Sequence, residues 1–414
     1  MKRVVITGMG VISPLGNDPQ VMFDNILKKT CAIKPITHFD TKDFRVKLAA
    51  EAEAFEDESL FKQSDLRFND RFTQFARIAG KRAYLQSGLE DVMLDRDRFG
   101  VIFGTGIAGI GSMEKAKENL DQRGPSRIFP HFIPMTIVNA AAAMIAIDLQ
   151  AYGPCIPVVT GCAAGSDAIG EAYLKIKHGL LDVALAGASE ASITPLGVGG
   201  FMAMRALYEG SDPTTASIPF DRLRSGFVMG EGAGALILEE YAHAKNRNAT
   251  ILAELVGYGS TCDAYHITAP QEEGTMIAKA MSNAINDADI LPADIDYINA
   301  HGTSTQLNDV IESRAIQKTL GKHKDTVFVS STKSHMGHLL GACGAVEAIV
   351  CIKVLEHGII PATIHTKDIA DTIQVNVVIG ENIHHATTYT MSNSLGFGGH
   401  NASLIFKRYT DHES

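Results

Sequence analysis

The stretch that decides the fold is PVVTGCAAGSDAIG, from Pro157 to Gly170. An apolar run ends at a single cysteine, Cys162, which is surrounded by small residues and followed by a helical pattern. In open α/β sheets such a turn lies at the carboxyl end of a strand, where functional sites gather. A buried cysteine is usually an inert apolar side chain. The rest of the chain must therefore decide whether Cys162 is a nucleophile.

Short β-branched runs alternate with helical patterns along the 414 residues, as in RVVITG, FGVIFGTG, DVALAGAS, ILAELVGYG, DYINAHG and VFVSSTKS. This alternation predicts βαβ crossovers and a largely parallel sheet, that is, an α/β fold. Two segments, VVTGCAAGSDAIGEAYLKIKHG and VSSTKSHMGHLLGACGAVEAIVCIKVLEHG, repeat a strand–turn–helix pattern and end in His-Gly. The glycine supplies a left-handed helix cap. We therefore expect a duplicated unit whose second copy starts near residue 250.

Composition narrows the class of protein. The net charge of −10 argues against general nucleic-acid binding, which needs a basic surface. The start, MKRVVITGMG, reads directly as a strand without a signal peptide, and no long apolar run predicts a membrane span. Six scattered cysteines without a CxxC pair are typical of reduced thiols. We expect a cytoplasmic protein without a nucleic-acid or membrane partner.

Two motifs suggest other chemistry but are weak. GTGIAG at 104–109 formally matches the dinucleotide fingerprint, yet the second strand with its acidic end is replaced by RGPSRIFPHFIP. His335 and His338 stand three residues apart, but no carboxylate or HExxH pattern accompanies them as a zinc site requires. A dinucleotide cofactor and a zinc centre are both disfavoured.

Three chemically active residues each follow the end of a predicted strand: Cys162, His301 and His338. A thiol at a helix N-terminus feels unpaired N–H groups and the positive end of the helix dipole, so we expect its pKa to be lowered. The small neighbours Gly161, Ala163 and Ala164 are expected to leave room for a substrate carbonyl. Taken together, the three residues favour nucleophilic catalysis over inert burial.

The motifs TGCAAGSDAIGEA, PFDRLRSGFVMGEGAGALILEE, GSTCDAYHITAP, INAHGTSTQLNDVIE, STKSHMGHLLGACGAVEAI and SNSLGFGGHNASLIF occur in order. In these motifs the chain resembles the elongating β-ketoacyl-acyl carrier protein synthases over essentially its full length. The resemblance implies the thiolase fold, with two similar halves in five α-β-α-β-α layers and a homodimer. The halves would be residues 1–250, with the nucleophilic cysteine, and 251–414, with the two catalytic histidines.

The resemblance also implies an acyltransferase of fatty acid biosynthesis with substrates carried on the phosphopantetheine of acyl carrier protein (ACP), and no permanently bound cofactor. Cys162 would hold the acyl chain as a thioester, while malonyl-ACP would lose carbon dioxide and attack it. His301 and His338 would stabilise the enolate oxygen through neutral imidazole N–H groups. The N–H groups of Cys162 and Phe397 would hold the acyl oxyanion, and Lys333 would support the site by its charge.

Further roles carry over by position. Thr303 and Thr305 would bind the phosphopantetheine arm, and Phe397 would form a gate between the glycines Gly396, Gly398 and Gly399. Ile107 and Phe201 would line the acyl pocket, and Glu347 would order the network around it. The positions that hold a monovalent cation in some relatives are Asn299, Glu347, Ser392 and Asn393. Because ACP is acidic, candidate docking residues are Arg67, Arg71, Arg127 and Arg205.

Several positions depart from the usual pattern. Gly161 replaces an alanine that fatty-acid enzymes usually carry, and Asp167 and Ser225 are unusual at their positions. In SHMGH, His335 and Met336 are expected to alter the wall beside His338. Because Thr-Gly-Cys is common in aromatic type II polyketide ketosynthases, the alternative is such a subunit, in a heterodimer with a chain-length partner.

Other members of the superfamily fit less well. A biosynthetic thiolase needs a second cysteine near the C-terminus, and none follows Cys351. A priming synthase would replace one histidine by asparagine, whereas His338 is present. A chain-length partner itself lacks the nucleophile, so Cys162 disfavours that non-catalytic class. The sequence leaves the acyl chain length and saturation open.

Overall fold

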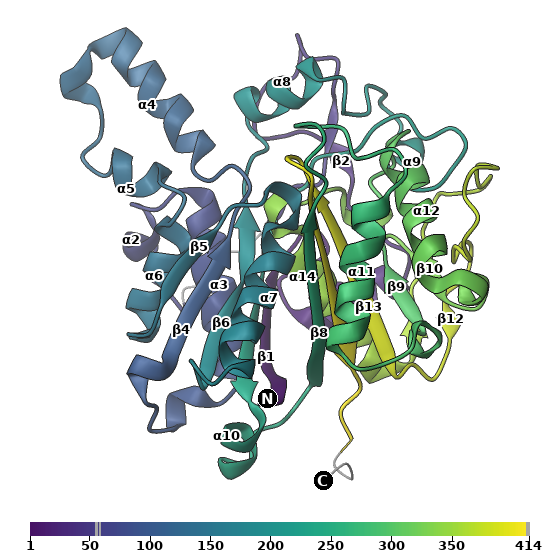
Figure 1. The fold of residues 1–414 in the computed structure, drawn as a ribbon. Coiled ribbons are helices and arrows are strands. Elements are labelled where there is room, and N and C mark those ends of the chain that lie inside the picture. Colours follow the sequence, from purple (N-terminus) through teal and green to yellow (C-terminus); the bar gives the residue numbers. More distant parts are fainter. Residues whose placement is uncertain (54–56, 58, 411–414) are drawn as a thin grey trace.

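The structure is a computed structural model that describes residues 1–53, 57 and 59–410. Its centre is a ten-stranded sheet in the order β10-β9-β13-β14-β8-β1-β7-β6-β4-β5 (Figure 1). The strands of the first half are β1 (Val4–Ile12), β4 (Phe99–Gly104), β5 (Cys155–Val158), β6 (Val183–Glu190) and β7 (Gly232–Glu240). Those of the second half are β8 (Ala253–Cys262), β9 (Tyr297–Asn299), β10 (Phe328–Ser330), β13 (Tyr389–Gly396) and β14 (His400–Lys407).

The two halves of the sheet repeat one topology. From the outer edge inward each runs third, second, fourth, fifth and first strand: β5-β4-β6-β7-β1 and β10-β9-β13-β14-β8. In both halves the second strand pairs in parallel with the third and fourth, and the fourth pairs antiparallel with the fifth. The halves join where β1 pairs antiparallel with β8. Antiparallel pairs outnumber parallel ones in this sheet, so the expectation of a largely parallel sheet was wrong. This repeat supports the expected division into 1–250 and 251–414, which stays a prediction as a domain boundary.

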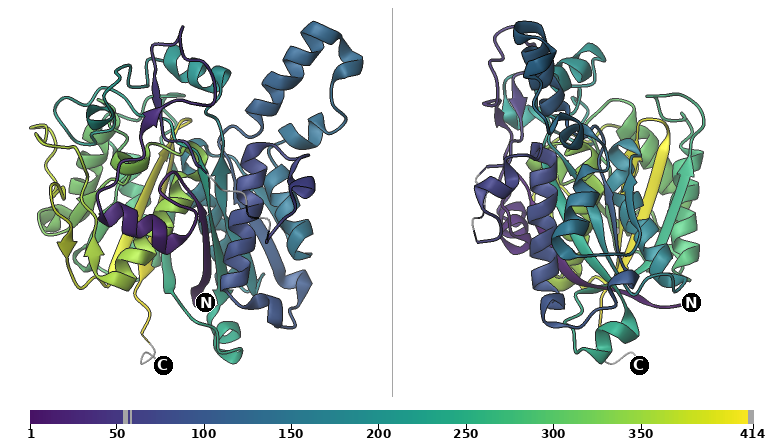
Figure 2. Two further views of the ribbon diagram at one scale, coloured as in Figure 1. Left: turned by 180° about the vertical axis from the view of Figure 1, so that it is seen from behind. Right: turned by 90° about the vertical axis from the view of Figure 1, so that its left-hand side faces the viewer.

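Helices form three layers around these two half-sheets (Figures 1 and 2). One outer layer contains α3 (Arg71–Gln86) on β1, β7 and β6, with α6 (Ala140–Leu149) beside it. The other contains α11 (Thr275–Asp287) on β8 and β14, with α12 (Asn308–Leu320) beside it. Between the half-sheets lie α7 (Ala164–Lys177) and α14 (Cys343–His357), which pack against each other. The result is the five-layered α-β-α-β-α arrangement that the sequence predicts.

The remaining elements surround these layers. The helices are α1 (Pro19–Leu27), which packs on α14, α2 (Gln63–Leu66), α4 (Ile110–Arg123), α5 (Phe132–Thr136), α8 (Pro195–Ala203), α9 (Pro213–Ala216), α10 (Tyr241–Asn246) and α13 (Lys333–Met336). Two small hairpins pair β2 (Lys34–Pro35) with β3 (Leu48–Ala49), and β11 (Ile359–Ile360) with β12 (Ile383–His384). The helix α4 projects from the body with α5 below it (Figure 1). Within the described ranges no helix is long and apolar enough to cross a membrane.

The small residues after Cys162 serve the packing of the central helices. A Cβ built on Gly165 would stand 2.6 Å from the Ala345 nitrogen, and one on Gly344 would stand 2.2 Å from Ser166 Oγ. Any larger residue would therefore push α7 and α14 apart. Ala163 and Ala164 are fully buried and do not line the active-site cavity, so they contribute to packing around the turn.

The predicted helix ends are confirmed. After α7 the chain turns at Gly179 with φ +74°, and α14 ends at Gly358 with φ +64°. Both values lie in the left-handed region that glycine adopts without a Cβ clash. The repeated strand–turn–helix units thus start from β5 and β10, the two outer strands of the sheet, and both end at a glycine with positive φ.

Candidate active site

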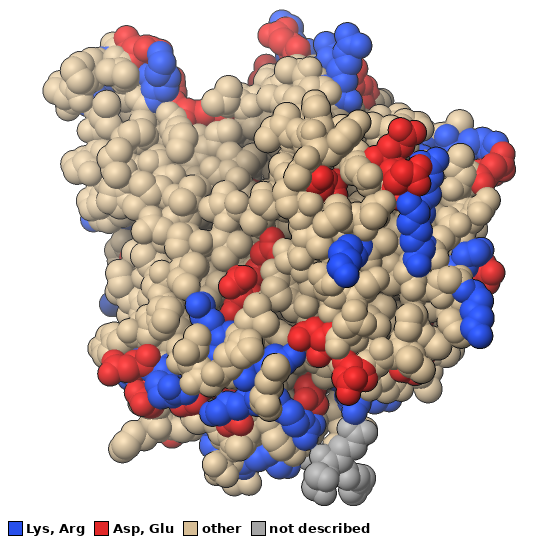
Figure 3. Space-filling model, in the orientation of Figure 1, with Lys and Arg blue, Asp and Glu red and all other residues tan. Residues whose placement is uncertain are grey.

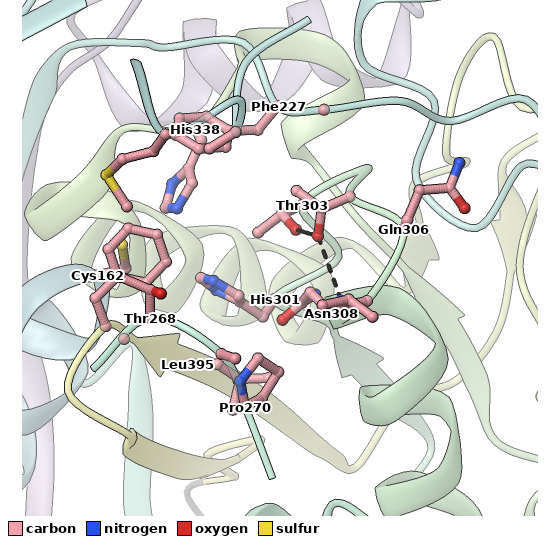
Figure 4. A pocket seen from close by; sticks show the side chains of 18 of the residues that line it. Cys162, Phe227, Thr268, Pro270, His301, Thr303, Gln306, Asn308, His338 and Leu395 are labelled. Atoms are coloured by element: carbon pink, nitrogen blue, oxygen red, sulfur yellow. Dashed lines mark hydrogen bonds between the residues drawn. The ribbon is translucent and has the colours of Figure 1, made fainter. Parts of the chain in front are cut away.

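Cys162, His301 and His338 line one cavity of about 370 Å³ (Figure 4). Cys162 lies in a 3-10 turn, η4 (Gly161–Ala163), between β5 and α7. His301 follows β9, and His338 follows α13. Both imidazoles point toward the space beside the thiol, and their ring centroids are 5.2 Å apart. Residues from both halves of the chain therefore meet at one point.

The environment of Cys162 corrects one expectation. Burial raises the pKa of its thiol to about 12, whereas the sequence predicts a lowered pKa. The charge of Lys333 and the backbone N–H groups of Phe397 and Cys162 act in the opposite direction, but they do not outweigh the loss of solvent. The resting residue is therefore a thiol. The same two N–H groups are the pair that the sequence assigns to an oxyanion hole.

The ring of His338 is held by two partners at its Nδ1 atom. Its Nδ1 accepts a hydrogen bond from the Leu340 N–H at 3.2 Å and lies 3.0 Å from Cys343 Sγ. Because an N–H donor faces Nδ1, the neutral ring carries its proton on Nε2. Burial, together with the nearby charge of Lys333, holds the pKa of His338 well below its ordinary value. His338 is thus a neutral imidazole with a donor left for the cavity.

His301 is neutral for similar reasons. Burial lowers its pKa well below the ordinary value, and Lys333 and His338 add to this effect. Its backbone N–H and that of Gly302 donate to the two carboxylate oxygens of Glu312, each at 2.8 Å. Glu312 therefore fixes the turn that carries His301, a role that sequence reasoning missed because the carboxylate lies eleven residues further along the chain.

A buried ion pair lies behind the imidazoles. Lys333 Nζ is 2.5 Å from Glu347 Oε1, and both side chains are almost completely buried. Burial disfavours the charge of Lys333, but the neighbouring Cys343 and Glu347 more than compensate and raise its pKa. The residue is therefore a fixed cation beside the site. This agrees with the position expected for Lys333.

The candidate cation positions fit a monovalent ion. Oδ1 of Asn299, Oε2 of Glu347 and Oγ of Ser392 are buried oxygens without a hydrogen-bond partner among the described residues. Asn299 and Ser392 are direct neighbours in the pairing of β9 with β13. The remaining member, Asn393, already accepts a bond from Ser403 through Oδ1. Oxygen ligands suit hard cations, so the first three would hold the ion, which would supply fixed positive charge beside Glu347.

An unbroken row of aromatic rings forms one wall of the cavity. Ring centroids lie 6.3 Å apart from Phe397 to Phe201, 5.5 Å from Phe201 to Phe227, and 5.0 Å from Phe227 to His338. Phe397 is 38% exposed and flanked by glycines, two of which have positive φ. Phe227 was not predicted, although it stands in one of the recognised motifs.

Other expected binding residues divide into two groups. Thr303 and Thr305 line the cavity, with their hydroxyls 3.0 Å apart, and the Asn308 N–H donates to Thr305 (Figure 4). Three residues do not line it: Ile107, Gly398 and Glu347. Ile107 instead packs with Cys162 and Phe201 against an apolar cluster that includes Phe227 and Leu340.

The four arginines have different surroundings. Arg205 is exposed at the cavity wall, and Arg67 and Arg127 are exposed on the surface. Arg71 makes a bidentate ion pair with the buried Glu231, at 2.6 and 3.0 Å. Its charge is therefore shared with a core carboxylate, and its assignment to a docking surface stays a prediction.

The unusual residues receive structural explanations. Gly161 has φ +57°, which is the left-handed region. Asp167 is buried and accepts hydrogen bonds from Thr160 and Tyr258, at 2.6 and 2.7 Å. Of the unusual positions, only Ser225 lines the cavity.

The expectation for His335 and Met336 was wrong. Both side chains are buried away from the cavity. The two ring nitrogens of His335 lie 3.1 and 2.9 Å from the carbonyl oxygens of Thr30 and Ala362, and Met336 packs in the main core.

The glycine-rich loop at 104–109 is occupied by a side chain of the protein. Glu190 accepts hydrogen bonds from the N–H groups of Gly106, Ile107 and Gly341, at 2.8, 3.3 and 3.3 Å. These are the kind of N–H groups that a dinucleotide phosphate would need. Burial raises the pKa of Glu190 to about 7. No group of three or more metal-ligating side chains occurs in the part of the chain that the structure describes.

Comparison with known proteins shows the family of the chain. Residues 1–244 match the family described as Beta-ketoacyl synthase, N-terminal domain, and residues 252–367 match Beta-ketoacyl synthase, C-terminal domain. The 3-oxoacyl-[acyl-carrier-protein] synthase 2 of Staphylococcus aureus is 45% identical over 408 residues, which is 99% of both chains. The enzyme of the same name from Coxiella burnetii is 43% identical over 411 residues, again 99% of both.

Solved structures agree. A β-ketoacyl synthase from Burkholderia phymatum superposes with a TM-score of 0.92 at 33% identity, over 99% of this chain and all of that one. A type II polyketide ketosynthase, solved with its acyl-carrier protein and bound to the hexaketide, gives 0.91 at 32% identity over the same shares. The chain belongs to the β-ketoacyl synthase family and has the thiolase fold. It is an acyltransferase that forms carbon–carbon bonds.

Proposed function

We propose that this synthase lengthens an acyl chain by two carbons in fatty acid biosynthesis, through a decarboxylative condensation with malonyl-ACP. Cys162 is the nucleophile, and His301 and His338 are the donors that stabilise the enolate. The observation that carries this assignment is the meeting of one thiol and two neutral imidazoles in one cavity. The reaction balances without an oxidant or reductant, so the substrates on ACP phosphopantetheine suffice.

In the first half-reaction, Cys162 attacks the thioester of acyl-ACP. A new thioester to Sγ forms, the bond to the phosphopantetheine sulfur breaks, and the thiol proton leaves on that sulfur. The raised pKa of Cys162 means that the thiolate exists only during attack. The N–H groups of Cys162 and Phe397 receive the charge of the tetrahedral oxygen, and Lys333 lowers the cost of the transient anion.

In the second half-reaction, malonyl-ACP loses carbon dioxide, and the pair of electrons forms an enolate. His301 and His338 donate hydrogen bonds to its oxygen. Neutral imidazoles suit this role because they give a donor without giving up a full proton. The enolate carbon then attacks the acyl carbonyl, Sγ leaves as a thiolate, and a proton restores the thiol. The product is a 3-oxoacyl-ACP.

Substrate binding follows the shape of the cavity. Thr303 and Thr305 bind the phosphopantetheine arm along the entrance, and Phe397 with Gly398 forms a gate beside the thiol. Ile107 and Phe201 bound the acyl chain in the apolar cluster behind Cys162. Arg67, Arg127 and Arg205 are exposed and attract the acidic ACP to the entrance.

A homodimer is the assembly that we propose. The strand β5 is an edge of the sheet, so its outer hydrogen-bonding groups have no strand partner among the described residues. Much of the surface over α5 and α6 carries few charges (Figure 3). Large apolar side chains are exposed around this edge: Ile133, Ile137, Val138, Ile147, Tyr152 and Val159. Pairing two copies there would cover them.

The fatty-acid pathway is favoured over a polyketide pathway. Relatives named 3-oxoacyl-ACP synthase are 45% identical, whereas the polyketide ketosynthase structure is 32% identical. A cytoplasmic location follows from the proposed pathway.

The test is turnover with defined acyl-ACPs and malonyl-ACP. We expect one carbon dioxide released per 3-oxoacyl-ACP formed, with a product two carbons longer than the acyl donor. Repeated extension without release of the product, or no extension of any saturated acyl-ACP, would contradict the proposal.

A further inference from the structure

The strongest unexplained feature of the site is a second thiol, Cys343, behind His338. Cys343 is the first residue of α14 and is 2% exposed, so solvent and substrate do not reach it. Its Sγ lies 3.0 Å from Nδ1 of His338, the ring nitrogen on the side away from the cavity. The mechanism above does not use this thiol.

The hydrogen bonds around the two groups define the direction of the thiol proton. The Leu339 N–H donates to Cys343 Sγ at 3.1 Å, so the sulfur is already an acceptor there. The Leu340 N–H donates to Nδ1 of His338, so that nitrogen is an acceptor as well. The arrangement in which both groups remain satisfied has the S–H proton pointing at Nδ1. Two donors then hold Nδ1 without a proton, and the ring proton stays on Nε2.

The other imidazole has no such support. Nδ1 of His301 is buried without a hydrogen-bond partner among the described residues. The two rings lie edge to face, yet only His338 has a thiol as well as a backbone N–H against its Nδ1. The charged pair of Lys333 and Glu347 lies near both rings but is not a hydrogen-bond partner of either among the interactions of the described residues.

We propose that Cys343 is a positioning residue that, together with the Leu340 N–H, holds His338 in its Nε2–H tautomer and so sets the rate of malonyl decarboxylation. The inference rests on the proposed function, because it deepens the role of His338 in that reaction. Cys343 touches no reacting atom. Its contribution acts only through the ring of His338, so the acylation of Cys162 does not depend on it.

The experiment separates the two half-reactions in Cys343→Ala, Cys343→Ser and the wild type. We expect Cys343→Ala to lower the rate of malonyl-ACP decarboxylation about tenfold, the effect of losing one hydrogen bond to a group that acts in the transition state. The rate at which acyl-ACP acylates Cys162 should stay unchanged. Cys343→Ser keeps a donor at the same place and should restore most of the lost rate.

A spectroscopic measurement reports the tautomer directly. In protein with ¹⁵N-labelled histidine, the ring of His338 should show a protonated Nε2 and an unprotonated Nδ1 in the wild type and in Cys343→Ser. In Cys343→Ala only the Leu340 N–H of the two donors remains at Nδ1, so the share of the Nδ1-protonated form should rise. The His338 signals are assigned by their loss in His338→Asn. If Cys343→Ala does not fold, the serine variant and these spectra still decide the question.

The matched control is Cys351→Ala on the same helix. Cys351 is also buried, but its thiol faces the carbonyl of Met391 instead of a catalytic ring. We expect it to leave both half-reactions unchanged. Equal decarboxylation rates in the wild type and Cys343→Ala, or loss of both half-reactions in step, would overturn the role of Cys343. If the wild type itself released no carbon dioxide from malonyl-ACP, the proposed function would fail instead.

Discussion

The two halves of the chain use one strand order but connect the third strand to the following helix differently. In the first half only residues 159–160 separate β5 from the turn η4, and Cys162 follows at once. In the second half residues 331–339 separate β10 from the corresponding 3-10 turn, η7 (Leu340–Ala342). The longer segment carries Lys333 and His338. The short turn of the first half thus positions the nucleophile Cys162. The longer segment of the second half positions the hydrogen-bond donor His338 together with Lys333.

Both units also carry a sulfur near the start of their central helix. Cys162 faces the cavity, while Cys343 faces the back of His338. The same local structure therefore supplies one residue that reacts and one that holds a neighbour. The two cysteines differ in the direction of their side chains and in the residues that cover them.

The largest expected effect concerns the ion pair behind the second-half loop. Lys333→Ala leaves Glu347 buried without its partner, and removing one member of a buried pair costs about 3–5 kcal/mol. We expect a fall of this size in the free energy of unfolding, measured by urea titration. Lys353→Ala is the control, because Lys353 pairs with the half-exposed Glu356. A similar small loss in both variants would show that the second-half loop does not depend on the pair.

A slightly smaller effect is expected when a histidine of the second half is removed while the nucleophile of the first half is kept. His301→Ala and His338→Ala each remove one donor to the enolate and should slow malonyl-ACP decarboxylation by about 10²–10³. Acylation of Cys162 should persist in both. Carbon dioxide release and mass shift of the intact protein measure the two steps. Wild-type decarboxylation in either variant would remove that imidazole from the mechanism.

The third prediction concerns Glu190, which lies in β6. Its carboxylate accepts a hydrogen bond from the Gly341 N–H and so joins the two halves of the chain. Burial raises its pKa to about 7, so the folded protein keeps a proton that the unfolded chain loses near pH ~4.3. The stability that the protonated Glu190 contributes should therefore be fully present below that pH. It should fall as pH rises toward 7, and the free energy of unfolding should level off above 7. Each pH unit in this window costs about 1.4 kcal/mol per proton held only by the folded state.

Glu190→Gln removes this titration. We expect urea unfolding at pH 5 and pH 7.5 to show a smaller loss of stability in Glu190→Gln than in the wild type. Glu312, whose pKa burial also raises to about 7, keeps part of the slope in the variant. Glu356→Gln, at a half-exposed site, should retain the wild-type slope. An unchanged slope in Glu190→Gln would contradict the assignment.

The smallest effect tests the short first-half turn. Gly161→Ala places a Cβ on a residue with φ +57° and should cost about 1–2 kcal/mol of unfolding free energy. The matched control is Gly200→Ala in α8, where a Cβ would meet nothing within 4 Å. That control should be neutral or stabilising by about 0.5–1 kcal/mol, since alanine favours helix. Thermal melts of both variants measure the difference, and equal shifts would refute a special backbone at Gly161.

The sequence was informative where local patterns decide the outcome. Alternating strands and helices, the His-Gly helix ends and the placement of Cys162, His301 and His338 past strand ends are all local. The pKa of Cys162 was mispredicted because a helix N-terminus can be read from sequence, whereas the burial that dominates it cannot.

Long-range partners account for the other differences. Arg71 pairs with Glu231, which lies 160 residues further along the chain. His335 contacts the backbone carbonyls of Thr30 and Ala362. Glu190 reaches three N–H groups from two distant loops. None of these contacts leaves a periodic or spacing signal, because packing of separate elements creates them.

The most direct measurement is the site at which the acyl group attaches. The protein is incubated with acyl-ACP alone, digested, and mapped by mass spectrometry, with Cys162→Ala as the control. We predict one acyl group per chain, on Cys162, and none in the variant. An acyl group on Cys31, Cys155 or Cys262, or acylation that survives in Cys162→Ala, would contradict the account.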